Sequence, residues 1–493
     1  MPTTSFVPRS RLLRLCIPCT ALLICACTVG PNFKPPAVNA PAHYVSRDAR
    51  APSTAITYGR NPPPDWWTQF HSARLNAVVR LALTDNRSLA ATVADLARAR
   101  QTVAARSGQR LPQITANAGA ARQQYGAAFS GPLTFPAFSA FSIGPTVSYL
   151  LDYNGSLKRA VEQQQALADA QAYQLDAARL ALSGNVALQS LTIAGGRAQV
   201  QAVQDLLHED RRNIGLVQSS LDAGMATRVE LLSAQSQLAQ DRTLLPPLRR
   251  QLARARDALS ILVGRAPADW NPPRFTLADF HPPQALPLSL PSALAHRRPD
   301  ILAAEARLHA ATAAIGVATA NLYPQIKLTA SASQQALDPG QMFSPASTAW
   351  SLAAGLAAPV FDGGTLHARR RAAVDAARSA LARYQQTVLQ SFGQVADVLQ
   401  DRKQDTAAME AQKQAQDIAQ TSLLLTRQSY QAGNTGILQV LDAQRQYLRA
   451  RLGYLQAQIR HIEDVVQLYL ALGGAEPTLG SHPQTASALQ INQ

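Results

Sequence analysis

Three short patterns in the chain combine residue types that enzymes use, but each lacks a partner that its chemistry requires. His208-Glu209 places a metal ligand beside a base without the second histidine of a zinc-binding helix. Gly195-Gly196 follows no phosphate-loop spacing, and Ser183-Gly184 has no base at a readable spacing. All three fit better as parts of ordinary helices. We therefore expect no enzyme activity, no metal and no cofactor.

The cysteines indicate processing instead of catalysis. All four lie in the first 27 residues: Cys16, Cys19, Cys25 and Cys27. Residues 1–26 have the basic start and short apolar stretch of a signal peptide. Ile24-Cys25-Ala26-Cys27 resembles a bacterial lipobox, although Cys25 is unusual at its position. We expect Cys27 to be the acylated, palmitate-bearing N-terminus of a lipoprotein; a plain signal peptide or a short anchor is the alternative.

Long helices make up most of the remaining chain. From Ser156 to Asp222 no proline interrupts the apolar periodicity, which predicts one helix of about 65 residues, about 100 Å long. After a hinge at Leu221–Thr227, leucine occupies every seventh position from Leu231 to Leu259, the pattern of an antiparallel coiled-coil hairpin. Pro246-Pro247 interrupts this return helix, so we expect a kink or break at Leu244-Leu245.

The same hairpin recurs later in the chain. Gly155, Ala223-Gly224 and Gly264 reappear 209 positions on, as Gly364, Ala432-Gly433 and Gly473. We expect Gly224 and Gly433 to adopt positive φ where each long helix ends. The sequence thus predicts a two-fold internal repeat. Its parts are a signal peptide at 1–26, a tether and first repeat at 27–290, a second repeat at 291–473, and a polar tail at 474–493.

Each repeat also contains two segments in which apolar and polar residues alternate. They begin near Gln113 and Phe141 in the first repeat and near Ile326 and Trp350 in the second. A period of two predicts four strands, each with one apolar and one polar face. Four strands cannot close a membrane barrel, which needs about eight. We therefore expect a mainly α chain whose strands pool, three copies together, into a 12-stranded barrel around a water-filled lumen.

The composition of the chain excludes few classes of protein, but it shows that the chain is basic. The formal net charge is +15 and aromatic residues are only 6% of the chain. Nucleic acid is a possible partner for so basic a chain. The arginines are nevertheless scattered through the helical pattern in short clusters, such as Arg249-Arg250 and Arg369-Arg370-Arg371. Such clusters are usually solvated helix faces, so we expect no nucleic-acid partner.

Several stretches, in order, resemble one known family. They are Cys27-Thr28-Val29-Gly30-Pro31, Asp65-Trp66-Trp67, Arg297-Arg298-Pro299-Asp300-Ile301, Tyr323-Pro324-Gln325-Ile326, Phe361-Asp362-Gly363-Gly364 and Leu441-Asp442-Ala443-Gln444-Arg445. Together they resemble the outer membrane factor family, the TolC-like exit ducts of tripartite efflux pumps, and within it lipoproteins of the OprM and NodT type. The resemblance implies a homotrimer in the outer membrane with a periplasmic α-helical tunnel. It also implies a periplasmic adaptor and an inner-membrane pump as partners, and export of drugs or other small toxic compounds, hence multidrug resistance.

A gate is expected at the far end of the tunnel from the strands. Leu438 and Asp442 are four residues apart, one turn beyond the Gly433 hinge, and so share one helix face. Threefold symmetry would bring three copies of each around the axis, and the family's closed gate resembles this arrangement, with Arg445 as a partner for Asp442. The alternative is that Asp442 only caps or pairs on a solvated face. We expect the two hinges, Leu221–Thr227 and Ser429–Gly436, to meet the adaptor.

Two other functions stay open at this point. The same fold could serve as a duct for type I protein secretion. A structural coiled-coil lipoprotein could brace the envelope without conducting anything. The alternating strands argue against the brace, because a brace has no use for a barrel.

Overall fold

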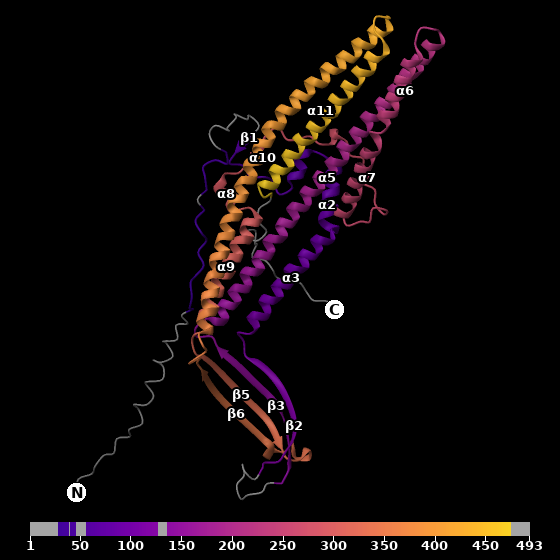
Figure 1. The fold of residues 1–493 in the computed structure, drawn as a ribbon. Helices are drawn as coiled ribbons and strands as arrows, with labels where there is room; N and C mark the ends of the chain where they lie inside the picture. The colour runs from indigo at the N-terminus through magenta and orange to yellow at the C-terminus, as the bar shows by residue number, and fades with distance from the viewer. Residues whose placement is uncertain (1–27, 39, 46–55, 127–135, 475–493) are drawn as a thin grey trace, which may run out of the picture. The chain divides into compact units, whose positions relative to one another are not determined.

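The computed structural model describes residues 28–38, 40–45, 56–126 and 136–474 (Figure 1). The expected signal peptide, Cys27 and nearly all of the expected tail lie outside these residues. Contacts divide the chain into two units. Unit 1 combines the N-terminal residues up to Pro36 with 97–170 and 305–383, and unit 2 combines 37–96, 171–304 and the residues from Tyr384 on. Each unit therefore takes segments from both sequence repeats, and the predicted repeat boundaries stay a prediction.

Corresponding helices of the two repeats have equal lengths. Helices α3 (Arg87–Gly108) and α9 (Pro299–Ala320) have 22 residues each. The long helices α5 (Ser156–Asp222) and α10 (Thr365–Gln431) have 67 residues each, which confirms the single unbroken helix predicted from Ser156. The two-fold repeat and the mainly helical fold class are thus confirmed, and both hairpins are visible in Figure 1.

The return arms differ between the repeats, as the prolines predicted. In the second repeat the arm is one helix, α11 (Ile437–Ala471). In the first it is divided into α6 (Arg228–Arg242) and α7 (Leu245–Leu262). Pro246 and Pro247 thus fall in the first turn of α7, where backbone N–H groups have no partner within the helix and proline is tolerated. The break therefore lies just before the prolines.

Unit 1 contains an antiparallel four-stranded sheet in the order β2-β3-β5-β6. Its strands are β2 (Gln113–Gln123), β3 (Phe138–Leu151), β5 (Gln325–Ala336) and β6 (Thr348–Ala357). One row across the sheet joins Ile114, Val147, Ala330 and Leu352, and the next joins Thr115, Thr146, Ser331 and Ser351. Neighbouring rows point to opposite faces. The register therefore confirms one apolar face and one polar face.

The two faces of the sheet differ in the contacts that their side chains make. On the polar face, Asn117 Nδ2 donates to Thr146 Oγ1 at 3.2 Å, and the Ser331 and Ser351 hydroxyls lie 2.8 Å apart. On the apolar face, Trp350 and Leu352 are 79% and 76% exposed. Among the described residues of the chain, nothing covers these two side chains.

Unit 2 surrounds the helical hairpins with shorter elements. Two short strands, β1 (Ile56–Tyr58) and β4 (Leu286–Leu288), pair in parallel. The remaining elements are α2 (Ala73–Asp85), α8 (Pro291–Ala295) and the 3-10 turns η3 (Trp66–Phe70) and η4 (Leu277–Asp279), while the turns η5 (Pro339–Gln341) and η6 (Pro345–Ser347) belong to unit 1. The paired tryptophans are buried, as expected. Trp66 stacks on Tyr469 of α11 with ring centroids 5.3 Å apart.

One helix among the described residues, α9, is long and apolar enough by length and composition to cross a membrane. Only a third of its most apolar window is buried. Core helices of soluble proteins pass the same test, so this finding alone does not place α9 in a membrane.

Candidate functional site

The two hairpin tips close in the same way. We call residues 221–227 the first tip and 429–436 the second tip. Gly224 has φ 75° and Gly433 has φ 77°, as predicted. After each glycine a backbone N–H reaches back to the end of the long helix, Met225 to Ser220 at 2.8 Å and Asn434 to Ser429 at 2.9 Å. A Cβ at either glycine would meet no atom within 4 Å, so glycine is required there for its backbone conformation and not for space.

The helices that leave the tips begin differently. At the first tip, Thr227 and Glu230 form a capping box: Glu230 N donates to Thr227 Oγ1 at 3.3 Å, and Thr227 N donates to Glu230 Oε2 at 2.7 Å. At the second tip, α11 begins at Ile437, and the residue in its N-cap position, Gly436, offers no side chain as a cap. The first turn of α11 must therefore be held mainly by packing.

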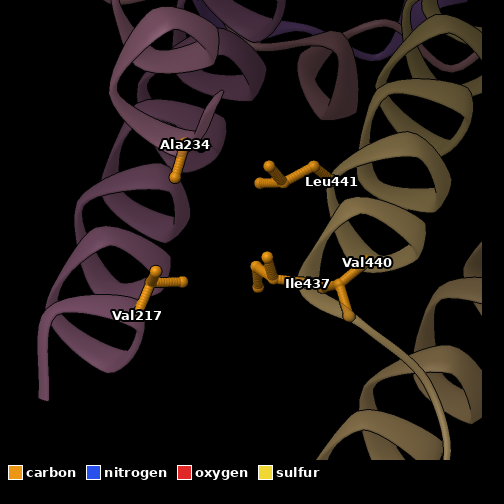
Figure 2. Packing of buried hydrophobic residues seen from close by; sticks show 5 residues of the cluster. All are labelled: Val217, Ala234, Ile437, Val440 and Leu441. Carbon is orange, nitrogen blue, oxygen red and sulfur yellow. The ribbon is translucent and has the colours of Figure 1, made fainter. Parts of the chain in front are cut away.

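That packing is a buried apolar cluster shown in Figure 2. Val217 of α5 and Ala234 of α6 face Ile437 and Leu441 of α11, and Val440 completes the cluster. All five are buried. Burying a large aliphatic side chain contributes roughly 1.5–3 kcal/mol. The cluster therefore fixes the start of α11 against the first hairpin.

The predicted gate residues lie on the other face of α11. Leu438 is 52% exposed, and the Asp442 side chain is 58% exposed. Arg445 Nη2 lies 3.6 Å from Asp442 Oδ1, so the expected ion pair is present. Gln446 Nε2 also donates to Asp442 Oδ2 at 2.7 Å. The two residues share an exposed face, as predicted, while their role in a gate stays a prediction.

A buried polar cluster next to these residues escaped the sequence analysis. It joins Asp210 and Asn213 of α5, Gln237 and Asp241 of α6, and Gln444 of α11. Gln444 is the bridge, because its Nε2 donates to Asp210 Oδ1 at 2.9 Å while its Oε1 accepts from Asn213 Nδ2 at 2.8 Å. Gln237 Nε2 donates to Asp241 Oδ2 at 2.6 Å. The second hairpin is thus tied to the first by polar as well as apolar contacts.

The cluster holds two carboxyl groups away from water. Burial, and then the neighbouring Asp241, raise the pKa of Asp210 to about 7. One signal for this cluster was present in the sequence. Asp210 lies between buried Leu207 and Val217, at a position where the 3-4 spacing of α5 predicts an apolar residue. A polar residue at a core position commonly fixes register at some cost in stability.

Two ion pairs add further links between the hairpins. Glu209 of α5 pairs with Arg427 of α10 at 2.9 Å, and Asp205 of α5 pairs with Arg451 of α11 at 3.0 Å. Both pairs are partly exposed, so each contributes little alone. They show that Glu209, which stood beside His208 in a possible metal motif, serves as an ion-pair partner.

The segment that follows Cys27 is held tightly to unit 1. Buried Arg159 of α5 donates to Asn32 Oδ1 at 2.6 Å and to the Val29 carbonyl at 3.2 Å. Its Nη1 donates to Glu162 Oε2 at 2.7 Å. The Val29 N–H in turn donates to the carbonyl of Asn154, just before α5 begins. Val29 and Asn32, two and five positions after the predicted acylation site, are therefore held by contacts at the start of α5.

Comparison with known proteins places the chain in a family. The family model for outer membrane efflux proteins matches residues 78–265 and 290–474, well over half of the chain. The chain is 31% identical to the outer membrane protein OprJ of Pseudomonas aeruginosa, over 92% of this chain and 94% of that protein. It is 29% identical to the toluene efflux pump outer membrane protein TtgF of Pseudomonas putida, over 94% and 98%. The solved structure of the outer-membrane channel OprN matches with a TM-score of 0.84 at 28% identity, over 91% of this chain and 99% of that one.

The chain belongs to the outer membrane efflux protein family. It is an efflux protein of the outer membrane, as the resemblance implied. The apolar face of the sheet and the long helices are the features that a channel of this class requires.

The first prediction concerns the buried carboxyl. Because the folded pKa of Asp210 is raised, its contribution to stability is fully present below the ordinary pKa of an aspartate and is lost as pH rises through about 7. Amide hydrogen exchange in residues 437–448, corrected for intrinsic rates, should therefore be faster at pH 8 than at pH 6. Asp210→Asn, which keeps a neutral group, should remove that difference, whereas Asp205→Asn should retain it. Equal protection at both pH values in the unmodified protein would contradict the prediction.

Proposed function

We propose that three copies of this chain form the exit duct of a tripartite efflux pump, passively conducting small toxic compounds across the outer membrane. The observation that carries the proposal is the two-faced sheet of unit 1. Its apolar residues Trp350 and Leu352 are uncovered, while the opposite face carries hydroxyl and amide side chains in hydrogen-bonded rows. Such a sheet suits lipid on one side and water on the other.

The open edges of this sheet support a trimer. Among the residues that the structure describes, strands β2 and β6 each pair on one side only. An unpaired edge cannot face lipid, because every backbone N–H and C=O in the hydrocarbon core needs a partner. Joining β2 of one copy to β6 of the next would satisfy both edges, and three copies would supply the 12 strands of the expected barrel.

Efflux is favoured over the two alternatives. TtgF is named as a component of a toluene efflux pump, and the family itself is described by efflux. Protein secretion would need the same duct but has no support in these names. A structural brace would leave the two-faced sheet without a role. We propose no catalytic step, because Glu209, the one candidate base singled out in the sequence, is engaged with Arg427 and Arg212.

The gate is proposed at the exposed face of α11. Three Leu438 side chains and three Asp442 side chains around a common axis would narrow the duct at its periplasmic end. The Arg445–Asp442 pair at 3.6 Å supports the proposal, since it holds the carboxylate in one orientation. Each such exposed pair contributes only about 0.2–1 kcal/mol. Closure would therefore depend on threefold repetition and could be reversed by a docked partner.

The second prediction tests the duct and its gate. Replacing Leu438 and Asp442 together by alanine removes the apolar ring and the acidic ring, so the conductance of the purified protein in planar bilayers should rise. Cells should also become sensitive to large antibiotics such as vancomycin. The control is Leu389→Ala with Asp375→Ala on α10, two residues that are 64% and 67% exposed. Unchanged conductance with intact trimers would place the constriction elsewhere, and no conductance from either the unmodified protein or the double variant would reject the duct.

The third prediction concerns the adaptor, which we propose docks on the tips. Met225 of the first tip and Val229, two residues beyond it on α6, are 79% and 71% exposed, as a docking surface would require. Gly433→Val forces a β-branched residue into positive φ and should reduce co-purification of the adaptor and pump while trimers persist. Gly436→Val is the matched control in the same tip, because Gly436 has φ −85°. Loss of trimers in the Gly433 variant would make the glycine a folding element and leave docking unsupported.

The fourth prediction concerns the lipid anchor. We propose that Cys27 is acylated, which its position directly before the clamped segment Thr28–Asn32 supports. Mass spectrometry of the mature N-terminus should find a diacylglyceryl-modified Cys27 carrying an amide-linked acyl chain. Cys27→Ser should abolish the modification while the signal peptide continues to direct export. A free N-terminus at another residue would contradict acylation.

A further inference from the structure

Three arginines gather where α5, α7 and the segment after α7 meet in unit 2. They are Arg197 of α5, Arg256 of α7 and Arg274 of the segment that follows α7. We call them the arginine cluster. Arg256 and Arg274 are the two cations whose charges act on the guanidinium of Arg197. All three side chains come from one copy of the chain, so the cluster forms without a second copy.

The packing of α5 on α7 explains why the first two arginines meet. Leu252 of α7 lies against Gly196 of α5. Arg197 is the residue after this glycine, and Arg256 follows Leu252 by one helical turn. Long side chains in a helix lean toward the N-terminus of their own helix. Because the two arms of the hairpin run antiparallel (Figure 1), the two guanidinium groups lean toward each other.

The segment after α7 brings the third arginine to the same place. Ser260, one turn beyond Arg256, donates from its Oγ to the Trp270 carbonyl at 3.4 Å. Phe275, the residue after Arg274, is fully buried. The segment between them is thus anchored beside the end of α7. Arg256 and Arg274 are themselves exposed, so a solute can reach the cluster from the solvent.

The positive charge of the cluster is not neutralised by the described part of the chain. Although Asp257 follows Arg256 directly, none of the three arginines forms an ion pair with a described carboxylate. Arg197 Nη1 is buried and has no hydrogen-bond acceptor among the same residues. Burial first, and then the two neighbouring cations, lower the pKa of Arg197. Arginine still keeps its proton in proteins, so only a bound anion can relieve this repulsion.

We propose that the arginine cluster is a binding site for a phosphate-type oxyanion. A guanidinium presents paired N–H groups whose spacing matches two oxygens of a phosphate. A tetrahedral phosphate has enough oxygens to accept from three guanidinium groups, and one of them supplies the acceptor that Arg197 Nη1 lacks. The bound oxyanion joins α5, α7 and the segment after α7. The site goes beyond the proposed duct and does not depend on it.

A direct binding measurement tests the site, and it is our fifth prediction. The full-length protein in detergent is dialysed to equilibrium against radiolabelled inorganic phosphate, with sodium chloride holding the ionic strength constant. One phosphate should bind per chain. Arg274→Gln should weaken binding by about tenfold or more, because a charged hydrogen-bond donor is lost. Arg254→Gln is the matched control, since it removes the same charge from an exposed position on another face of α7, and it should bind phosphate like the unmodified protein.

A competitor identifies the source of the phosphate group. Unlabelled inorganic phosphate and a soluble short-chain phosphatidic acid are compared for displacement of the label. Displacement by phosphate at the lower concentration assigns the site to the free anion, and displacement by the lipid at the lower concentration assigns it to a lipid headgroup. Displacement by chloride at equal ionic strength would overturn a site for an oxyanion.

Thermal unfolding provides a second readout with a sign that a purely structural role would not give. Phosphate should raise the unfolding midpoint of the unmodified protein, because it binds the folded state. It should not raise that of Arg274→Gln. In phosphate-free buffer this variant should be at least as stable as the unmodified protein, since it loses a repulsive charge.

Two results would overturn the proposal. One is the absence of saturable phosphate binding, or equal binding by Arg274→Gln and the unmodified protein. The other is a lower midpoint for Arg274→Gln in both buffers, which would show that carboxylates of the protein already neutralise the cluster. Neither readout uses conductance, so a failure here leaves the proposed duct untouched.

Discussion

The rest of this structure depends on one constraint, which is that a strand edge cannot be left unpaired in lipid. Strand β3 of the first repeat pairs with β5 of the second, so the two repeats share one sheet and only β2 and β6 remain as edges. Each unmatched backbone group in hydrocarbon costs several kcal/mol. A single chain cannot satisfy those edges by itself. The proposed assembly of copies follows from this cost more directly than from any side-chain contact.

Within that shared architecture the two repeats have diverged at the tips. The first repeat begins its return helix with the Thr227–Glu230 capping box and then breaks before Pro246-Pro247. The second begins at Ile437, after Gly436 and without a side-chain cap, and continues unbroken as α11. Asp442 lies 209 positions after Ser233, its counterpart in the first repeat. The exposed carboxylate at this position therefore occurs only in the second repeat. Local side-chain hydrogen bonds thus hold the start of α6, and packing on the first hairpin holds the start of α11.

The sequence alone predicted the elements well because their signals are local. Unbroken periodicity predicted α5, alternation predicted the four strands, and Gly224 and Gly433 have the expected positive φ. It did not predict the Asp210–Gln444 bridge or the contacts of Arg159 with Val29 and Asn32, because each joins residues more than 120 positions apart. A polar residue in an apolar stripe is equally consistent with a solvated face, and only its partner from another helix distinguishes the two cases. The proposed gate role of Leu438 and Asp442 needs several copies of the chain and was suggested only by the family resemblance.

The relative strengths of these contacts indicate how the proposed gate would open. Inside one copy, α11 is held by the Ile437–Leu441 cluster, where each large side chain contributes roughly 1.5–3 kcal/mol, and by the buried Gln444 bridge. Between copies, the gate would rely on exposed groups such as Asp442, whose pairs contribute about 0.2–1 kcal/mol each. The weaker contacts, those between copies, would break first. Opening would therefore move α11 together with the first hairpin of its own copy, away from its neighbours, instead of unwinding its first turn.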